Sequence, residues 1–180
     1  MHPWQVLSSR PLLDRLPWLR VWEEDVRLPG GLTIRGYLRT EGRAYAMVFA
    51  LLTDGTVPLV WQYKHGVGRL TCELPAGYLD TPDEPPLAAA RRELREETGL
   101  VAELWQPLGH LVIDTNRGDT RAHLFLALHA QRAGDPTPDP TEALEVTYHT
   151  PAELCQMVFS GQIDSLASAA AIMLALQKLP

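Results

Sequence analysis

The distribution of hydrophobic and polar residues predicts strands over the first part of the chain. Between residues 21 and 38, hydrophobic and polar residues alternate on either side of the turn sequence PGG, which is typical of a β-hairpin. Residues 44–52 and 57–63 are more continuously hydrophobic, and the Asp-Gly pair between them is favoured in tight hairpin turns. We therefore expect these two segments to form central strands, and the hydrophobic residues 122–130 to form another buried strand.

Two helices are expected near the end of the chain. Thr150 begins the sequence TPAE, which combines a capping residue, a proline at the first helical position and a glutamate three residues after the cap. This helix is expected to stop near Gly161, and another is expected from about Ser165 to Lys178. With the helix described below, the order is strands, one helix, strands and two helices. That order predicts an α+β fold with a mixed β-sheet packed between helices.

The composition is that of a globular protein. Of 180 residues, 46% are hydrophobic and 21% are charged, which is typical of soluble proteins. The first residues do not resemble a signal peptide, and the longest weakly polar stretch, residues 166–176, is too short to cross a bilayer. We therefore expect a cytoplasmic protein without a membrane partner. A net charge of -6 argues against a nucleic-acid partner and implies that an anionic substrate needs a metal cation for its attraction.

The third predicted helix carries a cluster of carboxylates. Asp83 and the two prolines after it are suited to the start of this helix, and Gly99 can end it in a left-handed conformation. Three hydrophobic residues form a stripe that can face the core: Leu87, Ala90 and Leu94. Three acidic residues occupy a neighbouring sector: Glu93, Glu96 and Glu97. Arg91 and Arg95 are expected to point away from both groups, toward solvent.

The residues alone leave two interpretations of this helix open. It is either a solvated surface helix with Arg–Glu ion pairs at i,i+4 spacing, or part of a metal site. Glu93 and Glu97 are one turn apart, and their repulsion destabilises a bare helix by roughly a few tenths of a kcal/mol. A divalent cation that bridges them would more than reverse this cost. Oxygen ligands of this kind select Mg²⁺ first and Mn²⁺ second.

Residues 77–100 resemble the Nudix box. In that motif a glycine is followed by five residues, a glutamate, seven residues and then Arg-Glu-aliphatic-any-Glu-Glu-any-Gly-aliphatic. The matching residues are Glu84, Arg92, Glu93, Leu94, Glu96, Glu97, Gly99 and Leu100. Gly77 departs from the motif, because six residues instead of five separate it from Glu84. The extra residue precedes the helix, so we expect it to alter the loop path and to leave the carboxylates in place.

The flanking sequences are similar to the ADP-ribose and nucleoside-diphosphate-sugar pyrophosphatase branch of this family. The segment QYKHGVGRLTCELPAG leads into the box, and GQIDSLASAAAIMLAL resembles the closing helix of that branch. The resemblance implies the Nudix fold, an α/β/α sandwich, over residues 43–180. It also implies that residues 1–42 form an antiparallel β extension that builds a homodimer, with an extra hairpin packed within one subunit as the alternative.

The same resemblance implies an enzymatic reaction and a metal. The reaction is the hydrolysis of the pyrophosphate bond of a nucleoside-diphosphate sugar such as ADP-ribose, which gives a nucleoside monophosphate and a sugar phosphate. It depends on Mg²⁺, with Mn²⁺ as the second candidate. Glu93 and Glu97 are the implied principal metal ligands, Glu96 ligates or assists through water, and the backbone carbonyl of Ala76 completes the site.

Other residues of the motif have supporting roles by the same resemblance. Arg92 and Glu84 are expected to form an orienting ion pair, because an arginine stays protonated and cannot act as a base. Gly77 lets the chain pass close to the helix. Lys64, Arg69 and Arg117 are candidate contacts for substrate phosphate oxygens, although exposed basic residues are usually only solvated.

The general base is less well defined by the resemblance. Thr120 stands where the branch often has a glutamate on a later loop, so Asp119 is the candidate there. The alternatives are Glu96 or metal-bound hydroxide alone, with Asp119 only a turn residue. Asn116 stands where ADP-ribose enzymes often have a proline, so the nucleotide and the sugar are not defined.

Two other functions are compatible with parts of the sequence. The first is a housecleaning hydrolase of nucleoside triphosphates or dinucleoside polyphosphates, which would release different products. The second is a Nudix-like ligand sensor without turnover, against which the intact Glu93, Glu96 and Glu97 argue.

Overall fold

The computed structural model describes residues 2–179, which form two compact units. The N-terminal unit contains the chain up to Ala44 and also a later segment, Val112–Arg121, here called the β9–β10 loop. The second unit contains Tyr45–Leu111 and the chain from Ala122 onward. The family resemblance implied an N-terminal extension over residues 1–42, but it did not indicate that a distant loop would join it.

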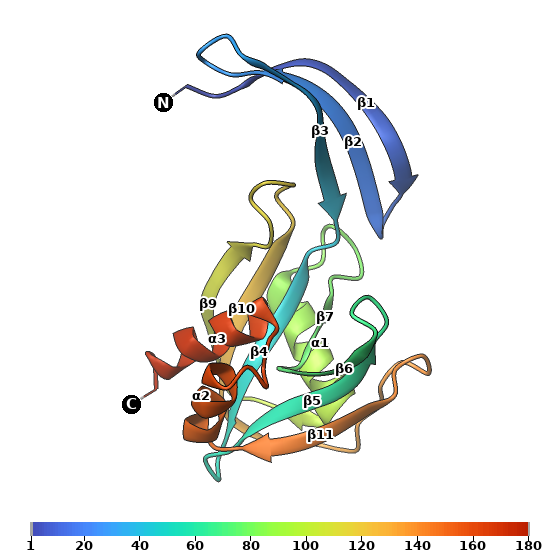
Figure 1. The fold of residues 1–180 in the computed structure, drawn as a ribbon. Helices are drawn as coiled ribbons and strands as arrows, with labels where there is room; N and C mark the ends of the chain where they lie inside the picture. Colours follow the sequence, from blue (N-terminus) through green and yellow to red (C-terminus); the bar gives the residue numbers. More distant parts are fainter. Residues whose placement is uncertain (1, 180) are drawn as a thin grey trace. The chain divides into compact units, whose positions relative to one another are not determined.

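The N-terminal unit is a three-stranded antiparallel sheet in the order β1-β2-β3 (Figure 1). Its strands are β1 (Gln5–Arg15), β2 (Leu19–Arg27) and β3 (Thr33–Gly42). The predicted hairpin is confirmed as β2 and β3, with Gly31 at a φ of 87° in the turn between them. The strand β1 was not predicted. Its side chains are exposed along its whole length, so burial imposes no alternation on its sequence.

The β9–β10 loop is bonded to β3 within the same unit. The Thr40 amide donates to the carbonyl of Arg117 at 2.6 Å, and the Gly42 amide donates to the Thr120 hydroxyl at 3.1 Å. A Cβ atom on Gly118 would lie 2.1 Å from the Thr40 carbonyl oxygen, so only glycine permits this approach. The loop therefore takes its path from β3.

The second unit contains two sheets and three helices. A mixed sheet has the order β7-β4-β10-β8, with β9 also paired to β10, and an antiparallel sheet has the order β11-β5-β6. The strands are β4 (Tyr45–Leu52), β5 (Val57–Lys64), β6 (Arg69–Glu73), β7 (Ala76–Tyr78), β8 (Leu100–Val101), β9 (Leu104–Val112), β10 (Arg121–Arg132) and β11 (Leu144–His149). The helices are α1 (Pro86–Thr98), α2 (Pro151–Phe159) and α3 (Leu166–Leu176).

The two segments expected as central strands are confirmed as β4 and β5. β4 lies between β7 and its parallel partner β10, whereas β5 lies between β11 and β6. The Asp-Gly turn between them is tight: the Leu52 amide donates to the Thr56 carbonyl at 2.8 Å, and Gly55 has a φ of 84°. The pattern did not reveal that the two strands belong to different sheets.

The core forms on both faces of β4. Met47 and Phe49 belong to the main hydrophobic cluster with residues of α3, while Ala46, Val48 and Ala50 alternate with them and are equally buried. Because successive strand residues point to opposite faces, both faces of β4 are covered. β4 packs against α1 and α3, and Figure 1 shows these helices on different sides of the strand. The expected packing of a mixed sheet between helices is confirmed.

The helix ends agree with the sequence signals with one exception. In α2, the Thr150 hydroxyl and the Glu153 side chain cap each other's backbone amides, as predicted. Gly99 ends α1 in a left-handed conformation with a φ of 72°, also as predicted. The prediction that Asp83 caps α1 was wrong. Pro86 keeps the preceding Pro85 out of the helical conformation, so Pro85 is the N-cap and Asp83 stands too early to reach the first helical amides.

Among the described residues, no helix combines the length and the hydrophobicity that a membrane-spanning helix requires.

Candidate active site

Two glutamates of α1 are buried against the short strand β7. Glu93 is only 8% exposed and Glu97 only 3% exposed. The Ala76 amide donates to Glu97 Oε2 at 3.0 Å, and a Cβ atom on Gly77 would lie 2.0 Å from Glu93 Oε1. The expectation that Gly77 lets the chain pass close to the helix is thereby confirmed. For Ala76, the structure gives its amide a role beside the carboxylates, while a role of its carbonyl stays a prediction.

The surroundings make the charged form of both carboxylates costly. Burial, and after it the charge of Glu93, raise the pKa of Glu97 to about 8 against the lowering effect of the Ala76 amide. Burial also raises the pKa of Glu93, although its ion pair with Arg92 opposes this. Buried acids with raised pKa values beside each other are typical of functional sites, because ionising both requires a compensating cation.

Arg92 forms ion pairs with four carboxylates, those of Asp80, Glu84, Glu93 and Glu96. Its Nη1 atom donates to Glu93 Oε1 at 2.6 Å and to Glu96 Oε2 at 3.2 Å, and its Nη2 atom lies 3.4 Å from Glu84 Oε2. The predicted ion pair with Glu84 is therefore present. The same Nη2 atom donates to the Tyr78 carbonyl at 2.9 Å, which ties the helix to the end of β7. These contacts fix the orientation of Arg92 and of the glutamates around it.

Glu142 is a further carboxylate near Glu93 and Glu97, and sequence reasoning missed it. Its charge raises the pKa of both Glu93 and Glu97. It is half-buried and precedes β11, after a turn in which its amide donates to the Asp139 carbonyl at 2.8 Å. No local motif marks this position. The one available signal in the sequence is its location, at the end of a proline-rich loop and just before a strand.

A cavity of about 230 Å³ lies next to the carboxylates. It is lined by Tyr45, Met47, Lys64, Glu73, Ala76, Gly77, Tyr78 and Ser165. The charge of Lys64 lowers the pKa of Glu97, which places this candidate phosphate ligand near the acidic pair. Lys64 and Gly77 thus border one space, while their contact with a substrate stays a prediction.

The remaining candidates have other partners. Arg69 forms an ion pair with Asp164. Arg117, in the N-terminal unit, donates from Nη1 to the Leu38 carbonyl at 3.3 Å. Asp119, in the same unit, is exposed and its carboxylate lies 2.6 Å from the Arg121 guanidinium.

The donor set fits a hard divalent cation. Among residues 2–179, no group of three or more His, Cys, Asp or Glu side chains is arranged as a preformed metal site. The reason is visible in the contacts: Arg92 binds Glu93 and Glu96, and the Ala76 amide binds Glu97. The candidate ligands are all carboxylate oxygens, and the buried Glu93 and Glu97 repel each other. Oxygen ligands of this kind are those that Mg²⁺ and Mn²⁺ bind.

Comparison with known proteins adds two family matches and several relatives. A family model described as the NUDIX domain matches residues 42–171, and one described as the nucleoside diphosphate sugar hydrolase N-terminal domain matches residues 4–38. An ADP-ribose pyrophosphatase of Mycobacterium tuberculosis is 36% identical over 171 residues, which cover 93% of this chain and 81% of the relative.

A CMP-5'-(N-acetyl-N-hydroxy-3-aminopropyl)phosphonate hydrolase of Streptomyces rubellomurinus is 34% identical over 154 residues, which cover 81% of this chain and 69% of the relative. Among solved structures, the crystal structure of an ADP compounds hydrolase matches with a TM-score of 0.86 at 20% identity, over 99% of this chain and 95% of that one. At that identity, the structural match speaks for the fold alone.

Proposed function

Because the chain belongs to the Nudix family of hydrolases, we propose that it hydrolyses the pyrophosphate bond of a nucleoside-diphosphate sugar such as ADP-ribose. The products would be a nucleoside monophosphate and a sugar phosphate. The observation that carries the proposal is the buried pair Glu93 and Glu97 at the Gly77 bend. The match of residues 4–38 to a nucleoside diphosphate sugar hydrolase domain supports this substrate class.

We further propose that Glu93 and Glu97 hold Mg²⁺ or Mn²⁺, assisted by Glu96 and the carbonyl of Ala76. When bound, such a cation neutralises pyrophosphate charge and lowers the pKa of bound water. The chain's own contribution is orientation: the Ala76 amide holds Glu97, and Arg92 holds Glu93 and Glu96. Because the pKa values of Glu93 and Glu97 are raised, ionisation of both carboxylates becomes favourable only when the cation is bound.

Substrate binding is assigned to the cavity beside the carboxylates. Its volume of about 230 Å³ is below the roughly 300–1,000 Å³ of typical small-molecule sites, so it accommodates one part of a nucleotide sugar. Lys64 borders this cavity and can meet a phosphate oxygen there. Arg69 and Arg117 are weaker candidates, since Asp164 and the Leu38 carbonyl already bind their guanidinium groups.

Two residues are candidates for the general base. Glu142 is supported by its electrostatic effect on both Glu93 and Glu97, which requires proximity to them. Asp119, the candidate from the sequence, is exposed and paired with Arg121. Thr120, at the position where the branch has a glutamate, accepts a hydrogen bond from the Gly42 amide and so serves the loop structure. We therefore favour Glu142.

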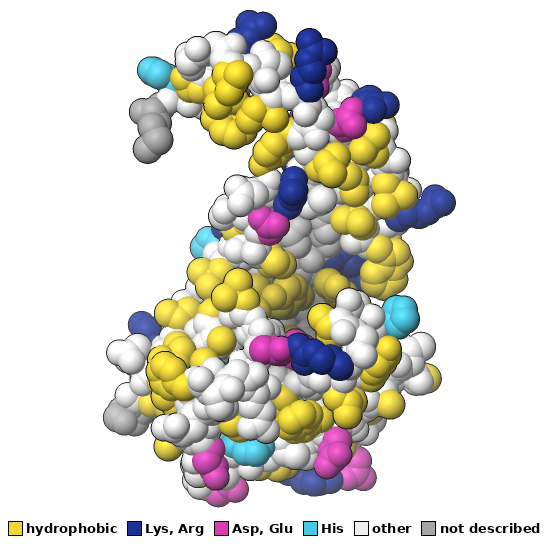
Figure 2. All heavy atoms as spheres, in the orientation of Figure 1, with side chains coloured by type: hydrophobic (Ala, Val, Ile, Leu, Met, Phe, Trp, Pro, Cys, Tyr) yellow, Lys and Arg dark blue, Asp and Glu magenta, His cyan; other side chains and the backbone are white. Residues whose placement is uncertain are grey.

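We also propose that the N-terminal sheet pairs with a second copy of the chain. Seven large hydrophobic side chains in and beside β1 are between 39% and 65% exposed: Trp4, Val6, Leu7, Leu12, Leu13, Leu16 and Trp18. Figure 2 shows hydrophobic side chains spread over this sheet. Exposed hydrophobic surface of this kind marks interaction sites, and a self-complementary patch is what a two-fold dimer requires.

A cytoplasmic location, expected from the sequence, stays a prediction.

A panel of nucleotide sugars tests the proposed reaction. Each is incubated with Mg²⁺, and the products are separated by chromatography. Release of a nucleoside monophosphate and a sugar phosphate is expected, whereas release of inorganic phosphate or pyrophosphate from nucleoside triphosphates would favour the housecleaning alternative. Glu97→Gln is expected to lower turnover at least about a hundredfold, the effect of losing one preorganised electrostatic group. Glu103→Gln, at an exposed glutamate, is the matched control and should retain activity.

A further inference from the structure

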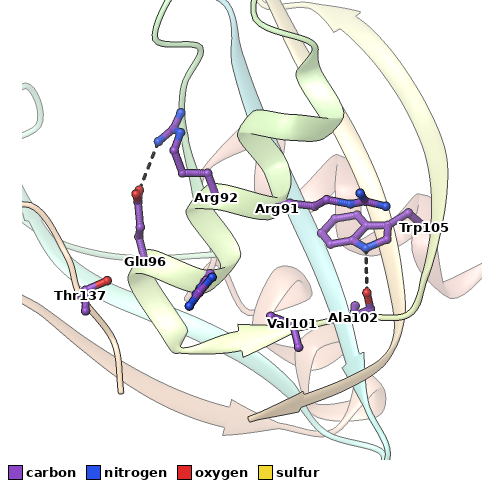
Figure 3. A pocket seen from close by; sticks show the side chains of 8 residues that line it. Arg91, Arg92, Glu96, Val101, Ala102, Trp105 and Thr137 are labelled. Atoms are coloured by element: carbon purple, nitrogen blue, oxygen red, sulfur yellow. Dashed lines mark hydrogen bonds and ion pairs between the residues drawn. The ribbon is translucent and has the colours of Figure 1, made fainter. Parts of the chain in front are cut away.

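A second, larger cavity lies on the outer side of α1, and it shares only Arg92 and Glu96 with the proposed catalytic site. Its volume is about 720 Å³. It is lined by Arg91, Arg92, Arg95, Glu96, Val101, Ala102, Trp105 and Thr137 (Figure 3). The sequence pattern predicted that Arg91 and Arg95 only face solvent. They are exposed, but both also form part of the wall of this cavity.

Two of these arginines, Arg91 and Arg95, form no ion pair within the described chain. Arg91 and Arg95 are like charges one turn apart, an arrangement that destabilises a helix. The residues three or four positions away on the helix include no carboxylate for either: Leu87, Ala88, Arg92, Leu94, Thr98 and Gly99. Neither arginine forms an ion pair with any residue between 2 and 179, whereas Arg92 pairs with Glu84, Glu93 and Glu96. In a chain of net charge -6, this cavity is therefore locally cationic.

An aromatic wall stands beside these charges. The Trp105 indole Nε1 atom donates to the Ala102 carbonyl at 3.1 Å, and its ring packs edge-on against Phe125 with centroids 6.4 Å apart. These two contacts fix the ring. The Arg91 guanidinium lies 5.6 Å from the Trp105 ring centroid, and Figure 3 shows the two side chains alongside each other. The cavity thus combines two guanidinium groups that lack ion pairs with an aromatic ring fixed in position.

We propose that this cavity binds a nucleoside monophosphate, with the phosphate at Arg91 and Arg95 and the base against Trp105. Guanidinium groups bind phosphate oxygens in a bidentate manner, and aromatic side chains stack on bases. The volume of about 720 Å³ suits a ligand of nucleotide size and far exceeds the space that a phosphate ion needs. The proposal concerns binding only and does not depend on the proposed catalytic reaction.

The Trp105 indole N–H resonance gives a site-specific test by nuclear magnetic resonance. Trp105→Phe assigns the resonance, and wild-type protein is titrated with adenosine monophosphate in the presence of a chelator, so that no metal-dependent site contributes. We expect the resonance to shift saturably. The double variant Arg91→Ala/Arg95→Ala is expected to weaken this binding at least about tenfold, because it removes two charge-assisted contacts. Both positions are exposed, so folding is not at risk.

A matched control removes two charges elsewhere. Arg27→Ala/Arg35→Ala, at exposed positions of the N-terminal sheet, should bind like the wild type. Equal affinity of the Arg91→Ala/Arg95→Ala variant and the wild type would overturn the site, as would a Trp105 resonance that never shifts. Inorganic phosphate and adenosine are titrated separately. Should inorganic phosphate bind as tightly as adenosine monophosphate, the assignment of a nucleoside ligand is wrong.

Discussion

Replacing Glu97 by glutamine is predicted to stabilise the metal-free protein at alkaline pH although it removes a proposed metal ligand. Burial raises the pKa of Glu97 to about 8 in the native state, whereas the ordinary value of a glutamate, near 4.5, applies to the unfolded chain. Between these two values the native protein holds a proton that the unfolded chain has released. The stability of the wild type must therefore fall as pH rises through this range.

The magnitude follows from the same two values. At about 1.4 kcal/mol per pH unit, a pKa difference between 4.5 and 8 corresponds to a loss of about 5 kcal/mol by pH 8. Glutamine avoids this loss because it carries no charge at any pH. At and below pH 8 the native Glu97 carboxyl is at least half protonated, so weakening its bond from the Ala76 amide costs only the roughly 0.5–1.5 kcal/mol of an ordinary hydrogen bond. The net expectation is that Glu97→Gln is about 4 kcal/mol more stable at pH 8 and equal or less stable near pH 5.

Urea unfolding in the presence of a chelator measures this difference between pH 5 and pH 9. Glu103→Gln, at an exposed glutamate, is the control and should follow the wild type at every pH. Adding Mg²⁺ at pH 8 should stabilise the wild type and leave Glu97→Gln nearly unchanged, because only the wild type gains a ligand-bound native state. If the Glu97→Gln and wild-type stabilities run parallel across the range, the buried carboxylate does not titrate as proposed and the reasoning fails.

Three further predictions concern the site and the assembly. Gly77→Ala should lower turnover strongly, because its Cβ would lie 2.0 Å from Glu93 Oε1, whereas Gly66→Ala, with no atom near, should leave steady-state kinetics unchanged. Glu142→Gln should lower kcat by about 10²–10⁴ as expected for a general base, and Asp119→Asn by less than about fivefold; the reverse order would restore Asp119 as the base. Sedimentation should show a dimer, and a fully active monomer at assay concentration would exclude a role of the N-terminal sheet in assembly.

The features that were predicted correctly depend on neighbours in the sequence. Thr150 and Glu153 cap each other across a single turn, and the left-handed Gly99 ends the helix it follows. The spacing of Glu93 and Glu97 likewise puts both on one helical face, whatever the rest of the fold does. Local geometry of this kind is fixed within one turn, so the sequence suffices for it.

The incorrect or missing features depend on competition between several local signals or on distant contacts. Asp83 has the residue type of a cap, but the two prolines after it decide where the helix begins. The loop that contains Asp119 was interpreted from its position after the motif. Its path is instead determined by β3, through bonds to Thr40 and Gly42 and the close approach of Gly118. None of these partners is near the loop in sequence.

Glu142 illustrates why the electrostatics of the site exceeded what a motif can reveal. The box defines three carboxylates on one helix, and their mutual repulsion could be derived from spacing alone. The size of the effect on Glu97 has a different origin, because burial is its largest cause and the charges of Glu93 and Glu142 add to it. Burial arises where α1 meets β7, and Glu142 arrives from the segment before β11. A helix with the same motif but without these neighbours would keep its glutamates exposed and ionised, and it would gain far less from binding a cation.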